Sequence, residues 1–454
     1  MIDPPLWLVI LPVAASPLIY LIRRWRVGAY LAALAALFAA VVAWRLPTTD
    51  PVRLMGRLFL LDPLTQQMLA LLFVLAAALF LVTWQLPRGR SFFALSLILL
   101  GLFAAAGMSR HLGITALIAA LSAIVAVPII QGGQTGSTRA AWRFLVMVLL
   151  ALPFFLLASW RVDLYREDVE NAVYLGQAAL FLGLGMAIWL AAVPLHGWLT
   201  AVGGEAPPAA AALVLATFPI LALVTLLHVL DEATWFTWLP QTGQLLMIAG
   251  LISAGVGGLL AAVQRGLRPL LGYAALFDLG CLLVALGVGG EGGGLAFYAG
   301  LATRVLGLAL AGGATAVIYQ RTGGDGFPVL HGAAHRLPLA TAALALGGFT
   351  LAGLPLTAAF FPRWLLFRDL AGIDPRWVWL LMGGGVGVSL GYLRGLYALL
   401  ASPNAARSAQ AGQDPLATVV LVLLGLLTLG LGLFPDPLLM LVKRLLVAYA
   451  LPPL

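Results

Sequence analysis

The stretch Leu190-Ala-Ala-Val-Pro-Leu-His-Gly-Trp-Leu-Thr-Ala-Val-Gly-Gly-Glu-Ala-Pro-Pro208 interrupts a long apolar run with a proline and a short polar, glycine-rich passage. A helix that breaks at membrane depth leaves backbone N–H and C=O groups unpaired, which is tolerated only against other protein or a wet cavity. A second stretch, Leu351-Ala-Gly-Leu-Pro355-Leu-Thr, has the same spacing around its proline. Broken helices in corresponding positions of two halves are typical of transporters.

The composition identifies the class of protein. Hydrophobic residues make up 62% of the 454 residues and charged residues only 9%, and the mean hydropathy is +1.05. Soluble domains carry about 25% charged residues, so we expect an all-α polytopic membrane protein. The net charge of +8 comes from arginines in predicted connections, which indicates membrane orientation rather than a nucleic-acid partner. The single cysteine, Cys281, lies in an apolar run and is interpreted as a small buried residue.

Apolar runs long enough to cross a hydrocarbon core of about 30 Å recur along the chain. We expect about 14 transmembrane helices, near residues 6–22, 27–44, 64–86, 91–108, 111–130, 140–160, 172–193, 207–229, 243–263, 268–288, 294–318, 338–367, 376–400 and 416–434. A short amphipathic tail follows, with Lys443 and Arg444. Arginines gather after odd-numbered spans and acidic residues after even ones, which predicts that both termini lie outside.

The two breaks predict an internal repeat. Pro194 and Pro355 are equivalent positions, so spans 4 to 8 and spans 9 to 13 are interpreted as repeats. Because each repeat has an odd number of spans, its copy enters the membrane with the opposite topology, which gives an inverted pair of five-helix repeats, each with a broken helix. The predicted units are the N-terminal flanking helices (1–90), the first repeat (91–230), the second repeat (243–400), and a C-terminal helix with the tail (416–454).

Pro194-Leu-His196-Gly-Trp198-Leu199, followed by Ala206-Pro207, resembles the P-x-H-x-W-L-P-x-A...A-P pattern of one family. This family comprises the antiporter-like, proton-translocating membrane subunits of complex I (NADH:quinone oxidoreductase), membrane hydrogenases and Mrp antiporters. Three further stretches fit it: Leu61-Asp62-Pro63-Leu64-Thr65, Arg268-Pro-Leu-Leu-Gly-Tyr273, and Leu351-Ala-Gly-Leu-Pro355 through Arg363-Trp-Leu-Leu-Phe367. The resemblance covers most of the chain and implies the same inverted-repeat fold.

The resemblance also implies where a proton path would run. The family's proton movement is attributed to a Glu in the fifth span, Lys residues in the seventh, eighth and eleventh, a His or similar group in the tenth, and a Lys or Glu in the twelfth. The fifth-span position falls at Ala119 or Ala120, the seventh on Trp189, and the eighth at or beside Pro219. The chain's one lysine lies in the tail. A lysine relay through this chain is therefore excluded, and the chain resembles a divergent member of the family.

The second half departs less from the family's pattern. Arg304 aligns with the eleventh-span lysine, Arg363 with the twelfth-span cation, and Asp278 stands where the tenth span often carries histidine. A relay group must change its protonation state, which a guanidinium with a pKa above about 12 does not. Ionisable residues within spans are functional candidates by default. Two interpretations stay open: Asp278 and Arg304 neutralise one another between adjacent spans, with Arg363 as a counter-ion, or the three form a working half-channel.

Other polar residues near the breaks are weaker candidates. His196 is interpreted either as a proton relay or as a partner for backbone groups freed by the break. Glu205 precedes the eighth span, where a carboxylate is stabilised by the helix dipole, and capping is favoured there over a place in the proton path. Arg110 and His111 are interpreted as solvated loop charges. No metal site and no cofactor-binding motif is predicted, since the chain lacks a cysteine cluster, a phosphate-binding loop and a dinucleotide fingerprint.

These observations lead to one expected function and two alternatives. We expect an antiporter-like membrane subunit of a complex I-related multi-subunit assembly, in which proton translocation is partial and confined to the second half, or lost. The alternatives are a non-translocating structural scaffold subunit and a stand-alone ion or solute transporter. No catalytic redox site is recognised in this chain, so any redox chemistry is expected in partner membrane subunits of a complex I-like, hydrogenase-like or Mrp-like assembly. A prokaryotic plasma membrane is the expected location, and no nucleic-acid partner is expected.

Overall fold

A computed structural model describes residues 3–23, 25, 27–48, 51–54, 56–84, 91–132, 139–168, 171, 173–232, 242–402 and 414–449. The ends of the first and last predicted units, residues 85–90 and 450–454, lie outside the described residues. Within the described residues the chain is built almost entirely of α-helices, so the all-α prediction is confirmed.

The first part of the chain forms flanking helices, a small hairpin and the helices of the first predicted repeat. These elements are α1 (Trp7–Leu21), α2 (Val27–Arg45), β1 (Val52–Leu54), β2 (Arg57–Phe59), α3 (Pro63–Val82), α4 (Phe92–Met108), α5 (Leu112–Gln131), α6 (Arg139–Glu167), α7 (Val173–Trp189), α8 (Gly197–Glu205) and α9 (Pro208–Glu232). The second part follows with α11 (Thr242–Val263), α12 (Leu267–Val288), α13 (Gly290–Thr322), α14 (Pro338–Ala352), α15 (Phe360–Ile373), α16 (Pro375–Leu400), α17 (Pro415–Leu433) and α18 (Asp436–Ala448).

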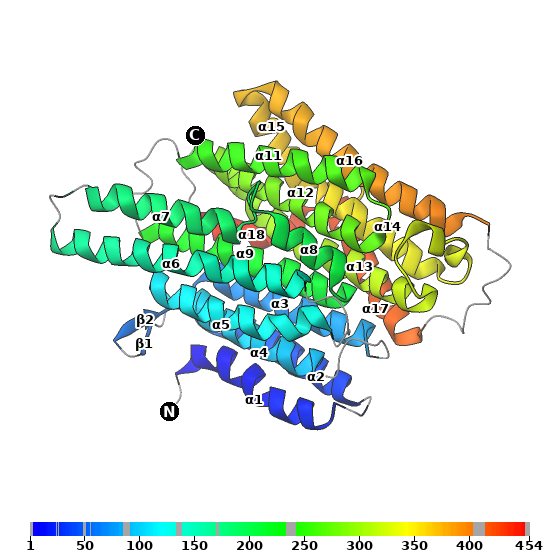
Figure 1. Ribbon diagram of the computed structural model, residues 1–454, viewed down its shortest axis with the longest axis horizontal. Helices are drawn as coiled ribbons and strands as arrows, with labels where there is room; N and C mark the ends of the chain where they lie inside the picture. The colour runs from blue at the N-terminus through cyan, green and yellow to red at the C-terminus, as the bar shows by residue number, and fades with distance from the viewer. Residues whose placement is uncertain are drawn as a thin grey trace.

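The helices lie roughly side by side and run along the long axis of the molecule (Figure 1). Among the described residues, ten helices are long and apolar enough to cross a membrane, and α4, α7 and α14 are shorter apolar helices. Two helices form the centre: α13 packs against α3, α9, α14 and α15, and α12 packs against α8, α11, α13 and α16. In the most apolar 18-residue stretch of α12 and of α13, 94% is buried, and the corresponding stretch of α9 is buried completely. The central helices therefore hold the charged residues away from lipid and water.

Both predicted helix breaks are present. Helix α7 ends at Trp189 and α8 begins at Gly197, and α14 ends at Ala352 and α15 begins at Phe360. The two breaks, residues 190–196 and 353–359, have the same length. Each contains one non-glycine residue in the left-handed region, Ala191 with φ 49° and Leu356 with φ 68°. The run 338–367, which the hydropathy joined into one span, is therefore two helices with irregular backbone between them.

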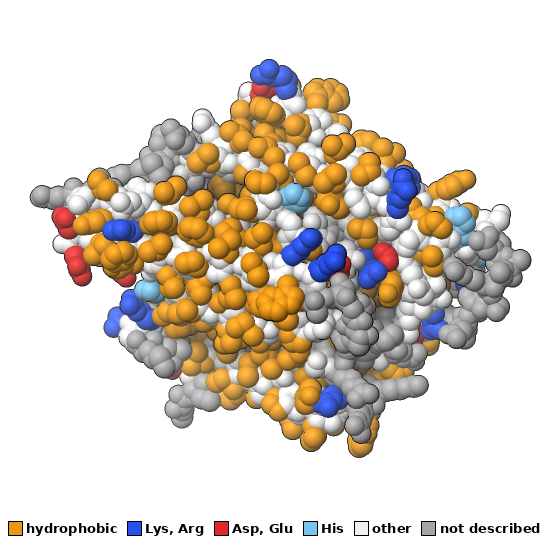
Figure 2. All heavy atoms as spheres, viewed as in Figure 1, with side chains coloured by type: hydrophobic (Ala, Val, Ile, Leu, Met, Phe, Trp, Pro, Cys, Tyr) orange, Lys and Arg blue, Asp and Glu red, His pale blue; other side chains and the backbone are white. Residues whose placement is uncertain are grey.

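The surface agrees with a membrane-embedded chain. Hydrophobic side chains cover much of the face drawn in Figure 2, and acidic side chains gather at its left end, where α6 ends. The small antiparallel hairpin, β1 paired with β2, lies at this same end (Figure 1). The sequence did not predict this hairpin. It turns at Gly56, whose φ of 76° favours glycine, and it positions the segment that leads to Asp62.

Candidate functional site

The two arginines of the second half bind the same carboxylate. Asp278 lies in the middle of α12, Arg304 in the middle of α13 and Arg363 in the first turn of α15, after the second break. Arg304 Nη1 donates to Asp278 Oδ2 at 2.8 Å, and Arg363 Nη2 donates to Asp278 Oδ1 at 2.5 Å. The side chains of Asp278 and Arg304 are 3% and 0% exposed. Each carboxylate oxygen thus faces its own guanidinium, and the buried group carries one net positive charge.

Arg304 also joins the two halves of the chain. Its Nη1 donates to the carbonyl oxygen of Ala275 at 2.9 Å, and its Nη2 donates to the carbonyl oxygen of Leu215 in α9 at 3.0 Å. In a regular helix the Leu215 carbonyl would accept from the N–H of residue 219, but that residue is Pro219 and has no N–H. Arg304 therefore satisfies a carbonyl group that the proline leaves unpaired.

The second break shapes the place of Arg363. Gly353, the C-cap of α14, has φ 79°, and a Cβ there would overlap Arg363 Cγ. The guanidinium of Arg363 also lies over the ring of Phe277, 5.4 Å from its centroid. A cavity of only about 10 Å³ adjoins Asp278, Arg363 and Cys281. This volume is about the smallest that holds one water molecule, so the cluster is close to dry.

Aromatic rings fill the positions where the resemblance placed the first-half lysines. Trp189 packs on Phe155 with ring centroids 4.3 Å apart, and its Nε1 lies 3.5 Å from the carbonyl oxygen of Val148. Phe218, next to Pro219, packs on Phe144 at 4.6 Å. All of these side chains are buried or nearly so. The middle of the first half is thus an apolar, ring-filled core.

The structure separates His196 from the charged cluster. His196 is the N-cap residue of α8 and is half-buried. Within the described residues, no hydrogen bond or ion pair joins it to Asp278, Arg304 or Arg363, and its Nδ1 is buried without a partner. The break itself is tied to α11, because the N–H of Val193 donates to Ser253 Oγ at 3.3 Å.

Glu205 caps a helix, but a different helix from the predicted one. Its Oε2 accepts from the backbone N–H of Ala140 at 3.1 Å, in the first turn of α6, whereas the sequence predicted a place at the start of α9. A carboxylate at this place is stabilised by the partial positive charge of the helix N-terminus. Its backbone carbonyl accepts from Arg268 Nη1 at 3.4 Å, and Arg268 pairs with Asp325 at 2.9 Å. Glu205 therefore belongs to a connection between helix ends.

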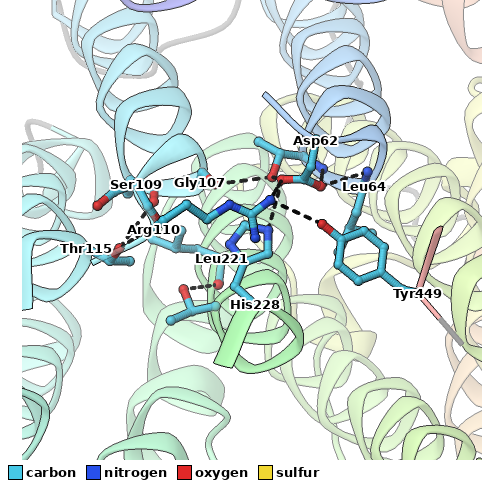
Figure 3. Close-up of polar contacts among 12 residues, drawn as sticks. Asp62, Leu64, Gly107, Ser109, Arg110, Thr115, Leu221, His228 and Tyr449 are labelled. Atoms are coloured by element: carbon cyan, nitrogen blue, oxygen red, sulfur yellow. Dashed lines mark hydrogen bonds and ion pairs between the residues drawn. The ribbon is translucent and has the colours of Figure 1, made fainter. Parts of the chain in front are cut away.

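A second buried charged cluster lies in the first half and was not predicted (Figure 3). Asp62 is the N-cap of α3, and its Oδ1 accepts from the N–H groups of Leu64 and Thr65 at 2.9 and 3.0 Å. Its Oδ2 lies 3.2 Å from Arg110 Nη2 and 3.0 Å from His228 Nε2. The side chains of Arg110 and His228 are 8% and 7% exposed. The interpretation of Arg110 as a solvated loop charge is wrong, since the α4–α5 turn folds inward.

The tail closes this cluster and connects it to α13. Arg110 Nη2 donates to the hydroxyl of Tyr449 at 3.3 Å, and the hydroxyl of Tyr298 donates to the backbone carbonyl of Tyr449 at 3.0 Å. Tyr298 lies on α13, the helix that carries Arg304. Burial raises the pKa of the Tyr449 phenol, and the negative charge of Asp62 adds to this effect. Tyr449 therefore remains a neutral hydrogen-bonding group.

Burial and hydrogen-bonded partners have opposite effects on the pKa of Asp62. Burial alone would raise the pKa of the Asp62 carboxyl, but the hydrogen bond with His228, the charge of Arg110 and the N–H of Thr65 together hold the pKa well below its ordinary value. His111 lies beside the cluster and accepts from the N–H of Ile114 through Nδ1 at 3.3 Å. Burial and the charge of Arg57 lower the pKa of His111.

A family model described as "NADH:quinone oxidoreductase/Mrp antiporter, TM" matches residues 123–389, a region that includes both breaks and the Asp278 cluster. The chain belongs to this family. It is 34% identical over 283 residues to NADH-quinone oxidoreductase subunit N of Ectopseudomonas mendocina, an alignment that covers 58% of this chain and 54% of that relative. It is 31% identical over 326 residues to NADH-quinone oxidoreductase subunit N 1 of Solidesulfovibrio magneticus, covering 66% of this chain and 68% of the relative.

Solved structures show that this antiporter-like chain shares the family's fold. A chain of the membrane-bound sulfane sulfur reductase, an archaeal respiratory membrane complex, matches with a TM-score of 0.86 and 17% identity, covering 98% of this chain and 78% of that chain. A chain of respiratory complex I from Thermus thermophilus with bound NADH matches with a TM-score of 0.79 and 21% identity, covering 98% and 99%. At these identities the likeness concerns the fold alone.

Proposed function

We propose that this antiporter-like chain is a membrane subunit of a complex I-related or Mrp-type assembly in a prokaryotic plasma membrane, and that its proton path is lost rather than confined to the second half. Family membership and the bacterial relatives support the first part. The observation that carries the second part is the clamp on Asp278, whose two oxygens face Arg304 and Arg363. Redox chemistry, in this proposal, belongs to the partner subunits.

Three features of the Asp278–Arg304–Arg363 cluster argue against proton transfer through it. The two guanidinium groups remain charged at physiological pH and do not pass protons on. Protonation of Asp278 would leave Arg304 and Arg363 buried near each other without a counter-charge, which is costly in an apolar interior. The cavity beside the cluster, about 10 Å³, has no room for a chain of water molecules. The cluster fits a fixed electrostatic support for the second break and for α13.

The packing of the first half favours a scaffold role. The ring pairs Trp189–Phe155 and Phe218–Phe144 occupy the region where the resemblance places proton-carrying lysines. An apolar, close-packed region excludes the water that a proton path needs. We therefore favour a structural scaffold function, in which the chain keeps the family's shape so that neighbouring membrane subunits have a surface to bind.

We also propose the finer architecture that the sequence suggested, with about 14 spans and with residues 91–230 and 243–400 as inverted five-helix repeats. The equal length of the two breaks, residues 190–196 and 353–359, supports this arrangement. Each break follows an apolar helix, α7 or α14, and is followed by a further helix, α8 or α15. Accessibility labelling of single cysteines placed in the connections, in right-side-out and inverted vesicles, tests the topology. Labelling of both repeats from the same side at equivalent positions would contradict it.

Purification of the full chain from native membranes tests the assembly. We expect other antiporter-like membrane subunits to copurify, identified by mass spectrometry. A chain with redox cofactors among them would assign the assembly to the complex I-related kind, and its absence to the Mrp type. Isolation of the chain alone, with a small molecule or ion bound in its interior, would instead support a stand-alone transporter.

Proton flux into vesicles that contain the purified assembly tests the loss of translocation. We expect substitutions that remove a carboxylate from this chain and leave the assembly intact to have no effect on flux. The single variant Asp278→Glu keeps the negative charge at this position. The double variant Asp278→Asn, Arg363→Met removes one charge of each sign, so the cluster keeps its net positive charge. We expect the proton flux of both variants to match that of the wild type when their assembly is intact. A specific fall in flux in the double variant, with normal subunit composition, would show that a second-half path operates.

A further inference from the structure

The first half contains a cavity that reaches the unpredicted charged cluster. It has a volume of about 260 Å³ and lies among α5, α6, α7 and α9. Small and apolar side chains such as Ala158, Ala178 and Leu182 line it, and Arg110 and His228 line it as well. A cavity of this size has room for several water molecules. Polar groups of the cluster are therefore within reach of water, unlike the Asp278 cluster in the second half.

His228 is the group of this cluster whose ring can hold a proton on either of two nitrogens. Its Nε2 lies 3.0 Å from Asp62 Oδ2, so the hydrogen of the neutral ring is assigned to Nε2, which donates to the carboxylate. An incoming proton would then bind at Nδ1 and give an imidazolium ion. Asp62 lies against this ion, and its other contacts, from Leu64 and Thr65, hold it in place. The proton thus enters a site whose counter-charge is already present.

The surroundings of His228 supply both signs of charge. The titratable and charged groups around it include Asp62 at the start of α3, Arg110 and His111 in the α4–α5 turn, Asp163, Tyr165 and Arg166 on α6, and Tyr449 in the tail, whose ring centroid lies 6.4 Å from that of His228. Asp231 follows His228 by one turn on α9, and Tyr298 on α13 donates to the backbone of Tyr449. Arg110 opposes protonation of His228 and Asp62 favours it. Because both arginine and histidine contact the same oxygen of Asp62, the carboxylate stabilises either charge state of the histidine.

We propose that His228, held by Asp62, is a proton-binding site that exchanges protons with water through this cavity. The site has no continuation across the membrane, because the buried rings of Trp189, Phe155 and Phe144 fill the middle of the first half. The site therefore binds and releases protons at one face of the membrane without passing them across. This inference goes beyond the proposed scaffold function, because a scaffold needs no exchangeable proton.

Chemical modification of the full chain in lipid nanodiscs tests whether the cavity reaches His228. Diethyl pyrocarbonate reacts with unprotonated, accessible imidazole, and peptide mapping identifies the modified histidine. We expect His228 to be modified in the wild type, and we expect Ala178→Leu on α7 and Ala158→Leu on α6, which fill the cavity from two walls, to abolish the modification. Ala371→Leu, at an exposed alanine of α15, is the matched control and should leave it unchanged. An unmodified His228 in the wild type, or modification that persists in both filled variants, would overturn the proposal.

Infrared difference spectra between two pH values test whether His228 binds a proton. With isotope-labelled histidine rings, we expect an imidazolium signal from the wild type that is reduced in His228→Gln, and that is also reduced when Asp62→Asn removes the counter-charge. His331→Gln, in the connection before α14, controls for the loss of any one of the five histidines. A His228→Gln variant that retains the wild-type melting temperature and the complete imidazolium signal would show that His228 does not exchange a proton.

Discussion

The carbonyl oxygen of Leu215 and Nη2 of Arg304 lie 3.0 Å apart and join the two halves of the chain across the α9–α13 interface. This bond depends on Pro219, which cannot donate to Leu215 from the next turn of α9. The family resemblance places a lysine at or beside Pro219 and another at Arg304. In this chain Pro219 leaves the carbonyl oxygen of Leu215 without its helical N–H partner, and Arg304 donates a hydrogen bond to that oxygen. Two positions associated with proton movement thus form a structural contact.

We expect Arg304→Met to lower the free energy of unfolding by about 2–6 kcal/mol, because it leaves Asp278 Oδ2 and the carbonyl oxygen of Leu215 without this donor, at about 1–3 kcal/mol for each buried acceptor. Arg304→Lys keeps the charge but has one nitrogen for three acceptors, so we expect a loss of about 1–3 kcal/mol. Unfolding in lipid nanodiscs measures both. Arg368→Lys, in an ion pair whose arginine side chain is 60% exposed, is the control and should change stability by less than about 1 kcal/mol. Equal effects at Arg304 and Arg368 would contradict the burial argument.

The role of Pro219 can be separated from that of the charge. Pro219→Ala restores an N–H that can donate to Leu215, so we expect the double variant Pro219→Ala, Arg304→Met to be more stable than the sum of the two single effects predicts. A double-mutant cycle of unfolding free energies measures this coupling, which should be about 0.5–3 kcal/mol for groups that share a partner. Strict additivity would mean that Arg304 does not replace the missing N–H.

The cost of backbone strain at Gly353, in the second break, can be separated from the cost of its contact with Arg363 by comparison with Gly323, which has a similar backbone conformation. Gly353 and Gly323 are both C-caps, with φ 79° and 74°, but a Cβ at Gly353 would overlap Arg363, whereas one at Gly323 meets nothing within 4 Å. We expect Gly323→Ala to cost about 1–2 kcal/mol from the left-handed backbone alone. Gly353→Ala should cost about 1–3 kcal/mol more, because it displaces Arg363 from Asp278. Similar unfolding free energies for the two variants would show that the contact with Arg363 contributes nothing.

Much of the fold could be predicted because hydropathy and helix breaking are local properties. The apolar runs gave the helix positions, and the spacing around Pro194 and Pro355 gave both breaks. The second break was harder to delimit, since Leu351 through Phe367 remains apolar and hydropathy alone joins α14 to α15. The β1–β2 hairpin was missed because each strand has only three residues, too few for a period-two pattern to stand out.

The two charged clusters differed in how visible they were in the sequence. Asp278 and Arg304 were found because charges within apolar spans are rare. Asp62, Arg110 and His228 were missed because each lies near a helix end, where charges are ordinary. The contacts also cross large distances in the chain, with 166 residues between Asp62 and His228 and 339 between Arg110 and Tyr449. Only the tertiary structure brings them together. The one local signal was the Asp62-Pro63 pair, an N-cap followed by proline at the first helical position.

The acid stability of the chain should depend on Asp62. The folded-state pKa of Asp62 lies below its ordinary value of 3.8, so the carboxylate stabilises the fold fully above pH 3.8 and this contribution is lost as the pH falls further. We expect Asp62→Asn, which can still cap α3, to be less stable than wild type at neutral pH and to approach it in acid. Melting temperatures across pH measure the difference. Asp374→Asn, at the N-cap of α16, is the control, because the side chain of Arg376, its ion-pair partner, is 86% exposed; we expect a smaller change than for Asp62→Asn.

His111 should give stability a second pH dependence nearer neutrality. Its Nδ1 caps α5 as an acceptor, and protonation would turn this nitrogen into a donor. Because its folded-state pKa lies below the ordinary value of 6.5, its contribution is complete above pH 6.5 and is lost as the pH falls below that value. We expect His111→Ala to cost about 0.5–2 kcal/mol, the range for a lost cap, above pH 6.5 and less at lower pH. A cost that is constant with pH would contradict the capping role.

We expect that the return of one lysine at Trp189 does not give the first half a proton path, because the ring is buried and packed against Phe155. Trp189 is 5% exposed and packs against Phe155 at 4.3 Å. We expect Trp189→Lys to lower the free energy of unfolding by about 3–5 kcal/mol, as for other losses of a buried large side chain, and to give no proton flux in vesicles. Trp189→Phe keeps a ring, and its cost should be clearly smaller. If Trp189→Lys conducts protons where wild type does not, then the lysine alone was missing and the ring-filled core is not the barrier.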